Sequence, residues 1–185
     1  TQLVGAPYRA VPVVAAVAEA LGLPGIGRDT AFHMKNKVAM RTRLAAHGVP
    51  QPPFARVRSL DDARAALAGP VGFPAVVKPS DSGGQRGVYF LESMVDAERH
   101  AAEAIAESPT GEAIVEGFMP GMEMNGIVVA RGGEAVTLTL SDRRRPPGIG
   151  FARAGRRFAV RQVQDAPGAQ PVHVVAVEGI RIALV

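Results

Sequence analysis

The sequence predicts an α+β protein, and three observations lead to this prediction. Patterns typical of helices and of strands alternate along the 185 residues, without internal repeats or low-complexity segments. Two pairs of strand patterns are joined by glycine-rich turns, at residues 80–87 and 131–133. Hydrophobic residues make up 47% and charged residues 21% of the chain, which is typical of a globular protein and excludes disorder as its main state.

The first fifty residues carry helical patterns. Residues 11–21 predict a short helix that ends at Gly22 and Pro24. Residues 30–47 predict a longer helix, because Gly48 follows it directly and Pro50 comes just beyond. The stiff segment 51–53, Gln-Pro-Pro, then indicates a boundary between two lobes.

Strands and helices alternate over the middle of the chain. Ser59 and Ser93 are each followed three residues later by an aspartate, and this capping-box spacing predicts helices that run to about residues 68 and 106. The remaining segments predict strands at 54–58, 75–78, 87–92 and 112–118, and a hairpin of 122–130 with 134–140. Residues 143–157 predict irregular structure, and the apolar segment 172–184 fits either a helix or a buried strand.

Composition excludes several classes of function. The chain has no cysteine, which excludes a disulfide scaffold, cysteine-bound zinc and a thiol nucleophile. Aromatic residues make up only 5%, so stacking surfaces for single-stranded nucleic acid are scarce. The apolar run 10–18 is far shorter than the ~20 residues of a membrane-spanning helix, and we expect a cytoplasmic protein. The net charge of +4 is compatible with nucleic acid, a membrane surface or a small anionic ligand.

Lysine is rare in this chain, so the positions of its lysines are informative. There are 18 arginines but only three lysines, at positions 35, 37 and 78. On the predicted helix 30–47, Lys37 and Arg41 fall within the apolar arc. Their charged ends either extend past the margin of the helix or face a polar cleft.

Lys78 ends an apolar strand, and a glycine-rich turn follows it. Successive backbone N–H groups in such a turn can surround phosphate oxygens, and Lys78 adds a positive charge beside them. A flexible hairpin loop with a surface lysine explains this segment equally well.

A third segment, 113–123, predicts a strand, a bend and a second strand. There Glu123 is either a ribose ligand or a solvated carboxylate, and backbone groups at the bend could contact an adenine edge.

In this order and spacing, the three segments resemble the ATP-grasp superfamily of ligases, which includes biotin carboxylase and D-alanine–D-alanine ligase. The resemblance covers nearly the whole chain, and residues 141–148 are most similar to the amino-acid (carboxylate–amine) ligases. It implies an α+β ATP-grasp fold that holds a nucleotide between two lobes and is incomplete at both ends. Residues 1–50 would end a pre-ATP-grasp domain and its connecting helix, 51–117 would form the small lid subdomain, and 118–185 would begin the larger subdomain.

The resemblance also assigns nucleotide-binding residues. Lys37 and Lys78 would bind the phosphates of ATP. The loop 82–88 would close over these phosphates through Ser82, Gly83, Gly84, Gly87 and Val88. The adenine end would be bound by Glu116, Gly117, Phe118 and Met119, with backbone contacts from Gly117 and Met119, and Glu123 would hold the ribose hydroxyls.

The implied activity is ligation of a carboxylic acid to an amine or another nucleophile through an acyl phosphate. Arg143 and Arg144 are the candidate catalytic residues, since arginine pairs well with carboxylates, and a solvated basic loop is the alternative. The family's magnesium ligands, a Glu and then a Glu-x-Asn, have no counterpart after Glu123, and the histidines lack metal-ligand spacing. We therefore expect Mg²⁺ to be bound outside this chain, and the chain alone to be an inactive middle part of a longer ligase.

The expected partners are ATP, a small carboxylate and an amine acceptor, with no membrane and no nucleic acid, and a homodimer is compatible with the resemblance. Two other functions stay open at this point. One is a nucleotide-binding module without catalysis, which the absent acidic motif favours. The other is a basic domain that binds nucleic acid, although its cations would be spread from Arg9 to Arg181.

Overall fold

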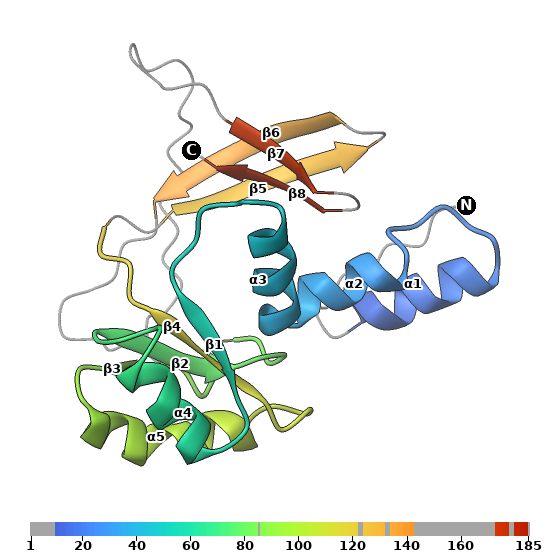
Figure 1. Ribbon diagram of the computed structural model, residues 1–185. Coiled ribbons are helices and arrows are strands. Elements are labelled where there is room, and N and C mark those ends of the chain that lie inside the picture. Colours follow the sequence, from blue (N-terminus) through green and yellow to red (C-terminus); the bar gives the residue numbers. More distant parts are fainter. Residues whose placement is uncertain are drawn as a thin grey trace, which may run out of the picture. The chain divides into compact units, whose positions relative to one another are not determined.

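The computed structural model describes residues 10–84, 86–121, 124–131, 134–142, 173–177 and 180–184. The chain forms two compact units, Thr1–Met119 (unit 1) and Pro120–Val185 (unit 2), and each is described by itself. Unit 1 contains a four-stranded sheet and five helices among its described residues, whereas the described part of unit 2 consists of strands (Figure 1). The predicted α+β class is confirmed.

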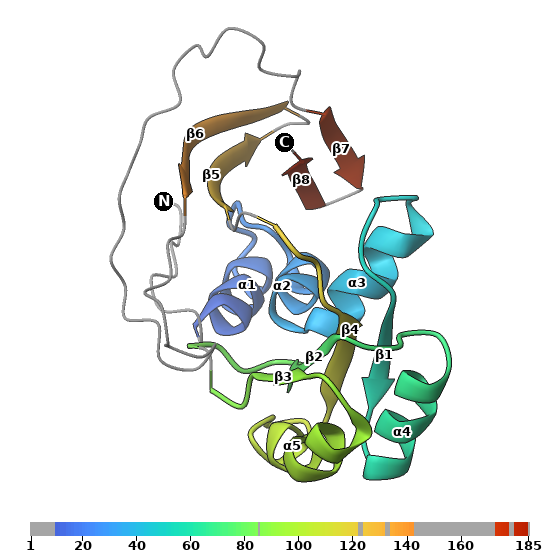
Figure 2. The same cartoon turned by 90° about the vertical axis from the view of Figure 1, so that its left-hand side faces the viewer.

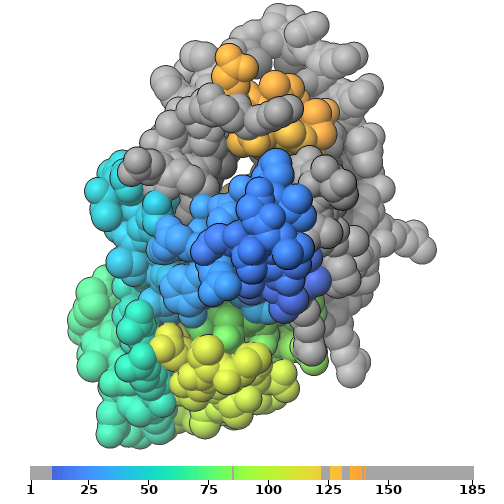
Figure 3. Space-filling view, turned by 90° about the vertical axis from the view of Figure 1, so that its right-hand side faces the viewer, coloured from blue at the N-terminus to red at the C-terminus, as the bar shows by residue number. Residues whose placement is uncertain are grey.

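Three helices open unit 1: α1 (Val11–Ala20), α2 (Arg28–Lys35) and α3 (Lys37–Ala46). The prediction for α1 is confirmed, and Pro12 lies in its first turn, where its missing N–H is harmless. The packing of α1 relies on small residues, since Ala15 and Ala18 are buried. Figure 3 looks onto the surface where α1 and α2 (blue) lie, and these helices keep several large apolar side chains exposed, among them Val13, Val17, Phe32 and Met34.

The prediction of one continuous helix over residues 30–47 is wrong, because Asn36 interrupts it. Asn36 has an extended backbone (φ −91°, ψ 113°), and its side-chain Oδ1 accepts a hydrogen bond of 2.9 Å from Ala39 N. Asn36 thus caps a new helix, α3, whose first residue is Lys37. The N–H of Lys37 donates to Ser80 O at 2.7 Å, which ties this helix start to the end of a strand.

The sheet of unit 1 has the strand order β1-β4-β2-β3, and all neighbours are antiparallel. Its strands lie close to the predicted segments: β1 (Phe54–Val57), β2 (Ala75–Pro79), β3 (Tyr89–Leu91) and β4 (Ala113–Gly117). The central strands β2 and β4 pair with Val76 opposite Glu116 and Lys78 opposite Ile114. Lys78 and Glu116 therefore lie on adjacent strands, diagonally across from each other, because Lys78 is two residues along β2 from the partner of Glu116.

Helices α4 (Leu60–Ala68) and α5 (Met94–Ala106) contact each other and cover one face of this sheet (Figure 2). Both predicted capping boxes are present. Asp62 N donates to Ser59 Oγ at 3.1 Å while Ser59 N donates to Asp62 Oδ2 at 3.1 Å, and Ser93 N donates to Asp96 Oδ2 at 3.0 Å. These local bonds satisfy backbone N–H groups that a helix start leaves unpaired, which explains why the sequence predicted both starts correctly.

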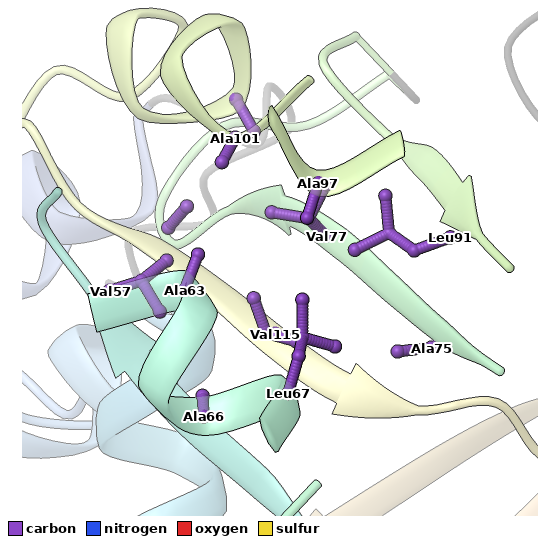
Figure 4. Packing of buried hydrophobic residues seen from close by; sticks show 12 residues of the cluster. Val57, Ala63, Ala66, Leu67, Ala75, Val77, Leu91, Ala97, Ala101 and Val115 are labelled. Atoms are coloured by element: carbon purple, nitrogen blue, oxygen red, sulfur yellow. The ribbon is translucent and has the colours of Figure 1, made fainter. Parts of the chain in front are cut away.

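The hydrophobic core lies between this sheet face and the two helices (Figure 4). Val77 and Val115 contribute from the central strands, while Ala97 and Ala101 of α5 allow the helix to approach closely. Burial of a valine or leucine side chain contributes roughly 1.5–3 kcal/mol. Because successive strand residues point to opposite faces, Lys78 and Glu116 lie on the other face of the sheet, away from this core. Helix α3 contacts β1 and β4, and its Arg41 reaches Glu116 on that second face.

The described part of unit 2 contains two antiparallel hairpins. The first, β5 (Met124–Arg131) with β6 (Glu134–Asp142), confirms the predicted hairpin, and its register shifts between Ile127 and Val128. The second consists of β7 (His173–Val177) and β8 (Ile180–Leu184), two short strands within the apolar segment 172–184. The predicted irregular segment 143–157 lies outside the described residues. Among the described residues, none of the helices is both long and apolar enough to cross a membrane.

Candidate functional site

The second face of the sheet in unit 1 carries a half-buried cluster of charges around Glu116. The side chain of Glu116 is only 10% exposed, and each of its two oxygens has a cationic partner. Lys78 Nζ pairs with Oε1, and Arg41 Nε donates to Oε2 at 3.2 Å. Lys78 comes from β2, Glu116 from β4 and Arg41 from α3, so the cluster requires the folded arrangement of all three elements.

Arg41 is itself fixed by the connector that follows α3. Gln51 Nε2 donates to Arg41 O at 2.8 Å, and Arg41 Nη1 lies 3.5 Å from Gln51 Oε1. The sequence predicted Arg41 within the apolar arc of a helix, with its charged end either past the margin of the helix or facing polar groups. The structure shows that the guanidinium faces a polar cluster. Gln51 carried no functional prediction, and its two contacts to Arg41 depend on the turn at residues 47–50.

Lys37 lies at the start of α3 and points to the segment that follows β2. Its Nζ donates to Pro79 O at 2.9 Å and to Ser82 O at 2.7 Å, and Ser80 O lies 3.5 Å away. Burial, and to a smaller extent the charge of Lys78, lower the pKa of Lys37 from 10.5 to about 8, although the carboxylates of Asp81 and Glu116 oppose this change. Lys37 and Lys78 are therefore close enough to influence each other, as their proposed common role requires.

The loop after β2 is attached at both ends to the segment that follows α5. Ser82 Oγ donates to Glu107 O at 2.6 Å. Gly87 has φ +65°, and a Cβ there would lie 2.9 Å from Pro79 Cγ and 3.1 Å from Glu107 Cβ. Gly84 has φ +78° with open space around it. The exposed part of the loop thus includes Gly83 and Gly84, whereas Gly87 is held by close packing.

A buried polar network at the base of this loop was missed by the sequence analysis. Asp81 is buried, and Ser108 Oγ donates to its Oδ1 at 2.6 Å. Ser108 Oγ also accepts from Glu112 N at 3.3 Å and lies 3.2 Å from Thr110 Oγ1. Asp81 also opposes the lowering of the Lys37 pKa. No spacing rule connects residues 81 and 108, since they lie in different segments that only the fold brings together.

The resemblance predicts that the adenine of ATP lies beside the end of β4 and the residues that follow it. Gly117 N donates to Pro53 O at 2.9 Å and Phe118 N donates to Pro74 O at 2.9 Å, so both N–H groups are used within unit 1. The ring of Phe118 packs edge-to-face on Phe90 with 4.9 Å between ring centroids. Met119 is 67% exposed. A contact of Gly117 with adenine therefore requires its carbonyl oxygen rather than its N–H.

Three of the predicted site residues lie outside the described residues: Glu123, Arg143 and Arg144. All the other predicted binding residues belong to unit 1, at the ends of β2 and β4, in the loop 82–88 and at the start of α3. Within the ranges that the structure describes, no three histidine, aspartate or glutamate side chains gather as a metal site.

The charges of the cluster favour an anionic ligand. Lys37, Lys78 and Arg41 face two buried carboxylates, Glu116 and Asp81, so the cations are in excess at the end of β2. A partly buried surplus of positive charge attracts anions more strongly than an exposed one, because solvent screens it less. The adjacent glycine-containing loop offers backbone N–H groups of the kind that bind phosphate oxygens.

Several known proteins are similar to this chain. No family model matches the chain. Over 73 residues the chain is 36% identical to the L-arginine-specific L-amino acid ligase of Bacillus subtilis, a match that covers 40% of this chain and 17% of that protein. The crystal structure of the L-amino acid ligase from Bacillus licheniformis superposes with a TM-score of 0.61 and 25% identity, over 77% of this chain and 32% of that one.

A second similar structure contains a nucleotide. It is the biotin carboxylase domain dimer of the 2-oxoglutarate carboxylase of Hydrogenobacter thermophilus, in complex with ADP, its magnesium salt and bicarbonate. The TM-score is 0.62 at 20% identity, over 72% of this chain and 32% of that chain, so this likeness concerns the fold. The chain spans less than a third of the length of the first curated relatives that it matches.

Proposed function

We propose that this chain, which has the ATP-grasp fold and whose relatives are ATP-grasp ligases, is the ATP-binding part of a ligase that forms C–N bonds. One observation carries this proposal: the two lysines that the resemblance assigns to phosphate binding lie together at the base of the glycine-containing loop. Burial and the nearby charge of Lys78 lower the pKa of Lys37 to about 8. Two partly buried ammonium groups beside backbone N–H groups form a favourable environment for a polyphosphate.

In this proposal the phosphates and the adenine of the nucleotide bind to unit 1 along the second face of the sheet. Lys37 and Lys78 bind phosphate oxygens, with Ser82, Gly83, Gly84, Gly87 and Val88 forming the loop over them. The adenine lies at the end of β4, where Glu116, the carbonyl of Gly117, Phe118 and the exposed Met119 meet it. Glu123 binds the ribose hydroxyls.

The proposed reaction joins a small carboxylic acid to an amine or another nucleophile. The carboxylate attacks the γ-phosphate of ATP, ADP leaves, and the acyl phosphate is then displaced by the nucleophile with release of phosphate. Because phosphoryl transfer depends mainly on positioning and on neutralisation of charge, lysines and arginines can supply much of the catalysis. Arg143 and Arg144 are the proposed contacts for the carboxylate or for the developing negative charge.

Mg²⁺ fits the described residues poorly. Hard divalent cations require several oxygen ligands, and the described part of the chain holds no acidic cluster that provides them. We therefore assign no metal ligand among the described residues. The same observation favours the second candidate function, a module that binds nucleotide without turning it over. We propose a cytoplasmic protein whose partners are ATP, a small carboxylate and an amine acceptor, and a homodimer is compatible with this proposal.

A basic domain that binds nucleic acid is less well supported. Many arginines of unit 1 are in ion pairs with acidic side chains of the same unit, so they do not form an open positive surface. Such pairs join Arg43 to Asp29, both Arg56 and Arg58 to Glu112, and Arg64 to Glu98.

Calorimetric titration of the 185-residue chain with ATP and Mg²⁺ tests the proposal. We expect wild type to bind, and Lys78→Ala to bind about 10- to 100-fold more weakly, because a charge-assisted hydrogen bond contributes roughly 1.5–3 kcal/mol. Arg64→Ala is the matched control, since it removes one positive charge from the exposed side of α4. The site assignment is wrong if wild type binds no nucleotide, or if Lys78→Ala binds as tightly as the control.

A further inference from the structure

The carboxylate of Glu116 has two cationic partners where one would balance its charge. Lys78 pairs with Oε1 and Arg41 with Oε2, and the side chain of Glu116 is almost completely buried. The two partners differ in how firmly they are held. Arg41 is fixed by Gln51, which both accepts from its guanidinium and donates to its backbone carbonyl. The ammonium group of Lys78 is instead carried by a flexible chain of four carbons, beside the glycine-containing loop.

Lys78 must change partner if it binds phosphate as proposed above. Its ammonium would then turn from Glu116 to an oxygen of the nucleotide. A buried carboxylate that loses its counter-ion is strongly destabilised, and this cost would oppose nucleotide binding. A second cation that stays on Glu116 removes most of the cost.

We propose that Arg41 is a positioning residue: it is the permanent counter-ion of Glu116, and it frees Lys78 to bind the phosphates of the nucleotide. This inference rests on the proposed function. Arg41 does not touch the nucleotide in this proposal and acts only through Glu116. Because α3 contacts both β1 and β4, the helix holds the guanidinium beside Glu116 whichever partner Lys78 has.

The proposal predicts different effects of Arg41 on folding and on binding. In Arg41→Met, Glu116 keeps Lys78 as its single counter-ion, so the protein without nucleotide remains folded. Lys78 is then held by Glu116 and is less available to phosphate. We expect ATP to bind about tenfold more weakly to Arg41→Met, while Arg41→Lys, which keeps the charge, stays within about threefold of wild type.

A double-mutant cycle with Glu116→Gln tests whether Arg41 acts through Glu116. Titration calorimetry with ATP and Mg²⁺ is applied to the 185-residue wild type, Arg41→Met, Glu116→Gln and the double variant. In the Glu116→Gln background the carboxylate is neutral, so Arg41→Met should no longer weaken binding. Circular dichroism on each variant checks the fold, and Arg41→Gln replaces Arg41→Met in the cycle if the latter does not fold.

The possible results separate the inference from the function on which it rests. If wild type does not bind ATP, the proposed function fails first. If wild type binds and Arg41→Met binds equally well, Arg41 is not needed to free Lys78. The inference is also overturned if Arg41→Met weakens binding by the same factor with Gln at position 116, or if Arg41→Lys binds as weakly as Arg41→Met.

Discussion

Lys37 shows how one residue combines a structural and a binding role. Its backbone N–H and its ammonium both donate to the segment 79–82, so it holds the start of α3 against the end of β2. Burial of the ammonium lowers its pKa to about 8. A phosphate ligand would have to replace some of the carbonyl oxygens that now surround the ammonium, and its negative charge would stabilise the protonated form.

ATP affinity should therefore fall as the pH rises through about 8, since Lys37 loses its proton there. The groups that set this pKa besides burial are Lys78 and Lys35, which lower it, and Asp81 and Glu116, which raise it. We expect roughly tenfold weaker binding one pH unit above the pKa, well above the titration of the terminal phosphate near pH 6. Calorimetry from neutral to alkaline pH measures this change.

Lys37→Arg provides the control, because a guanidinium stays charged over this pH range. Its affinity for ATP should vary little with pH, and equal pH profiles for Lys37→Arg and wild type would contradict the assignment.

The stability of the protein should change with pH in the opposite direction to its affinity for ATP. The folded pKa lies below the ordinary 10.5, so the unfolded chain binds more protons between pH 8 and 10.5, and the contribution of Lys37 to stability rises with pH there.

The sequence indicated the main charged residues of the site but not their contacts. Lys37 and Arg41 were noticeable as cations within an apolar arc, and Lys78 as a lysine at the end of an apolar strand. The pairing of Arg41 with Glu116 joins residues 75 positions apart, and that of Ser108 with Asp81 joins residues 27 apart. Local patterns carry no information about such pairs, because the register of β2 and β4 and the packing of α3 create them.

Among the elements, α4 and α5 were predictable because their capping boxes are local, whereas the break between α2 and α3 was not. A helix period continues across residues 30–47, and only Asn36 leaves it. The break is supported by a tertiary hydrogen bond from Lys37 N to Ser80 O at 2.7 Å, which a continuous helix would lose. The split places Lys37 in the first turn of a helix, where its N–H is free to make that bond.

The loop after β2 should respond differently to substitutions at its two described left-handed glycines. Gly84→Ala should cost about 1–2 kcal/mol, the penalty of a left-handed residue, because its surroundings are open. Gly87→Ala should cost at least about 1 kcal/mol more, since its Cβ would lie 2.9 Å from Pro79 Cγ. Urea unfolding of both variants measures the difference. Equal losses would mean that the loop does not pack on Pro79 and Glu107 in solution.

For the whole molecule, the two units differ in how they are stabilised. All twelve residues of the hydrophobic core cluster lie between Val57 and Val115, within unit 1. The hairpin β5–β6 of unit 2 instead keeps large apolar side chains exposed, namely Ile127, Val129, Val136 and Leu138. The sequence could not predict this difference, since both parts have similar apolar patterns and only the packing distinguishes them.

Residues 1–119 should therefore fold without residues 120–185. We expect the shortened chain to show a cooperative thermal transition by circular dichroism, within a few degrees of the first transition of the full chain, because it keeps every residue of the core cluster between the sheet and helices α4 and α5. An unfolded 1–119, or one that melts more than about 10 °C lower, would mean that unit 2 contributes to the stability of unit 1. A shift of that size corresponds to roughly 2–3 kcal/mol in a domain of this length, comparable with the contribution of one buried valine or leucine side chain.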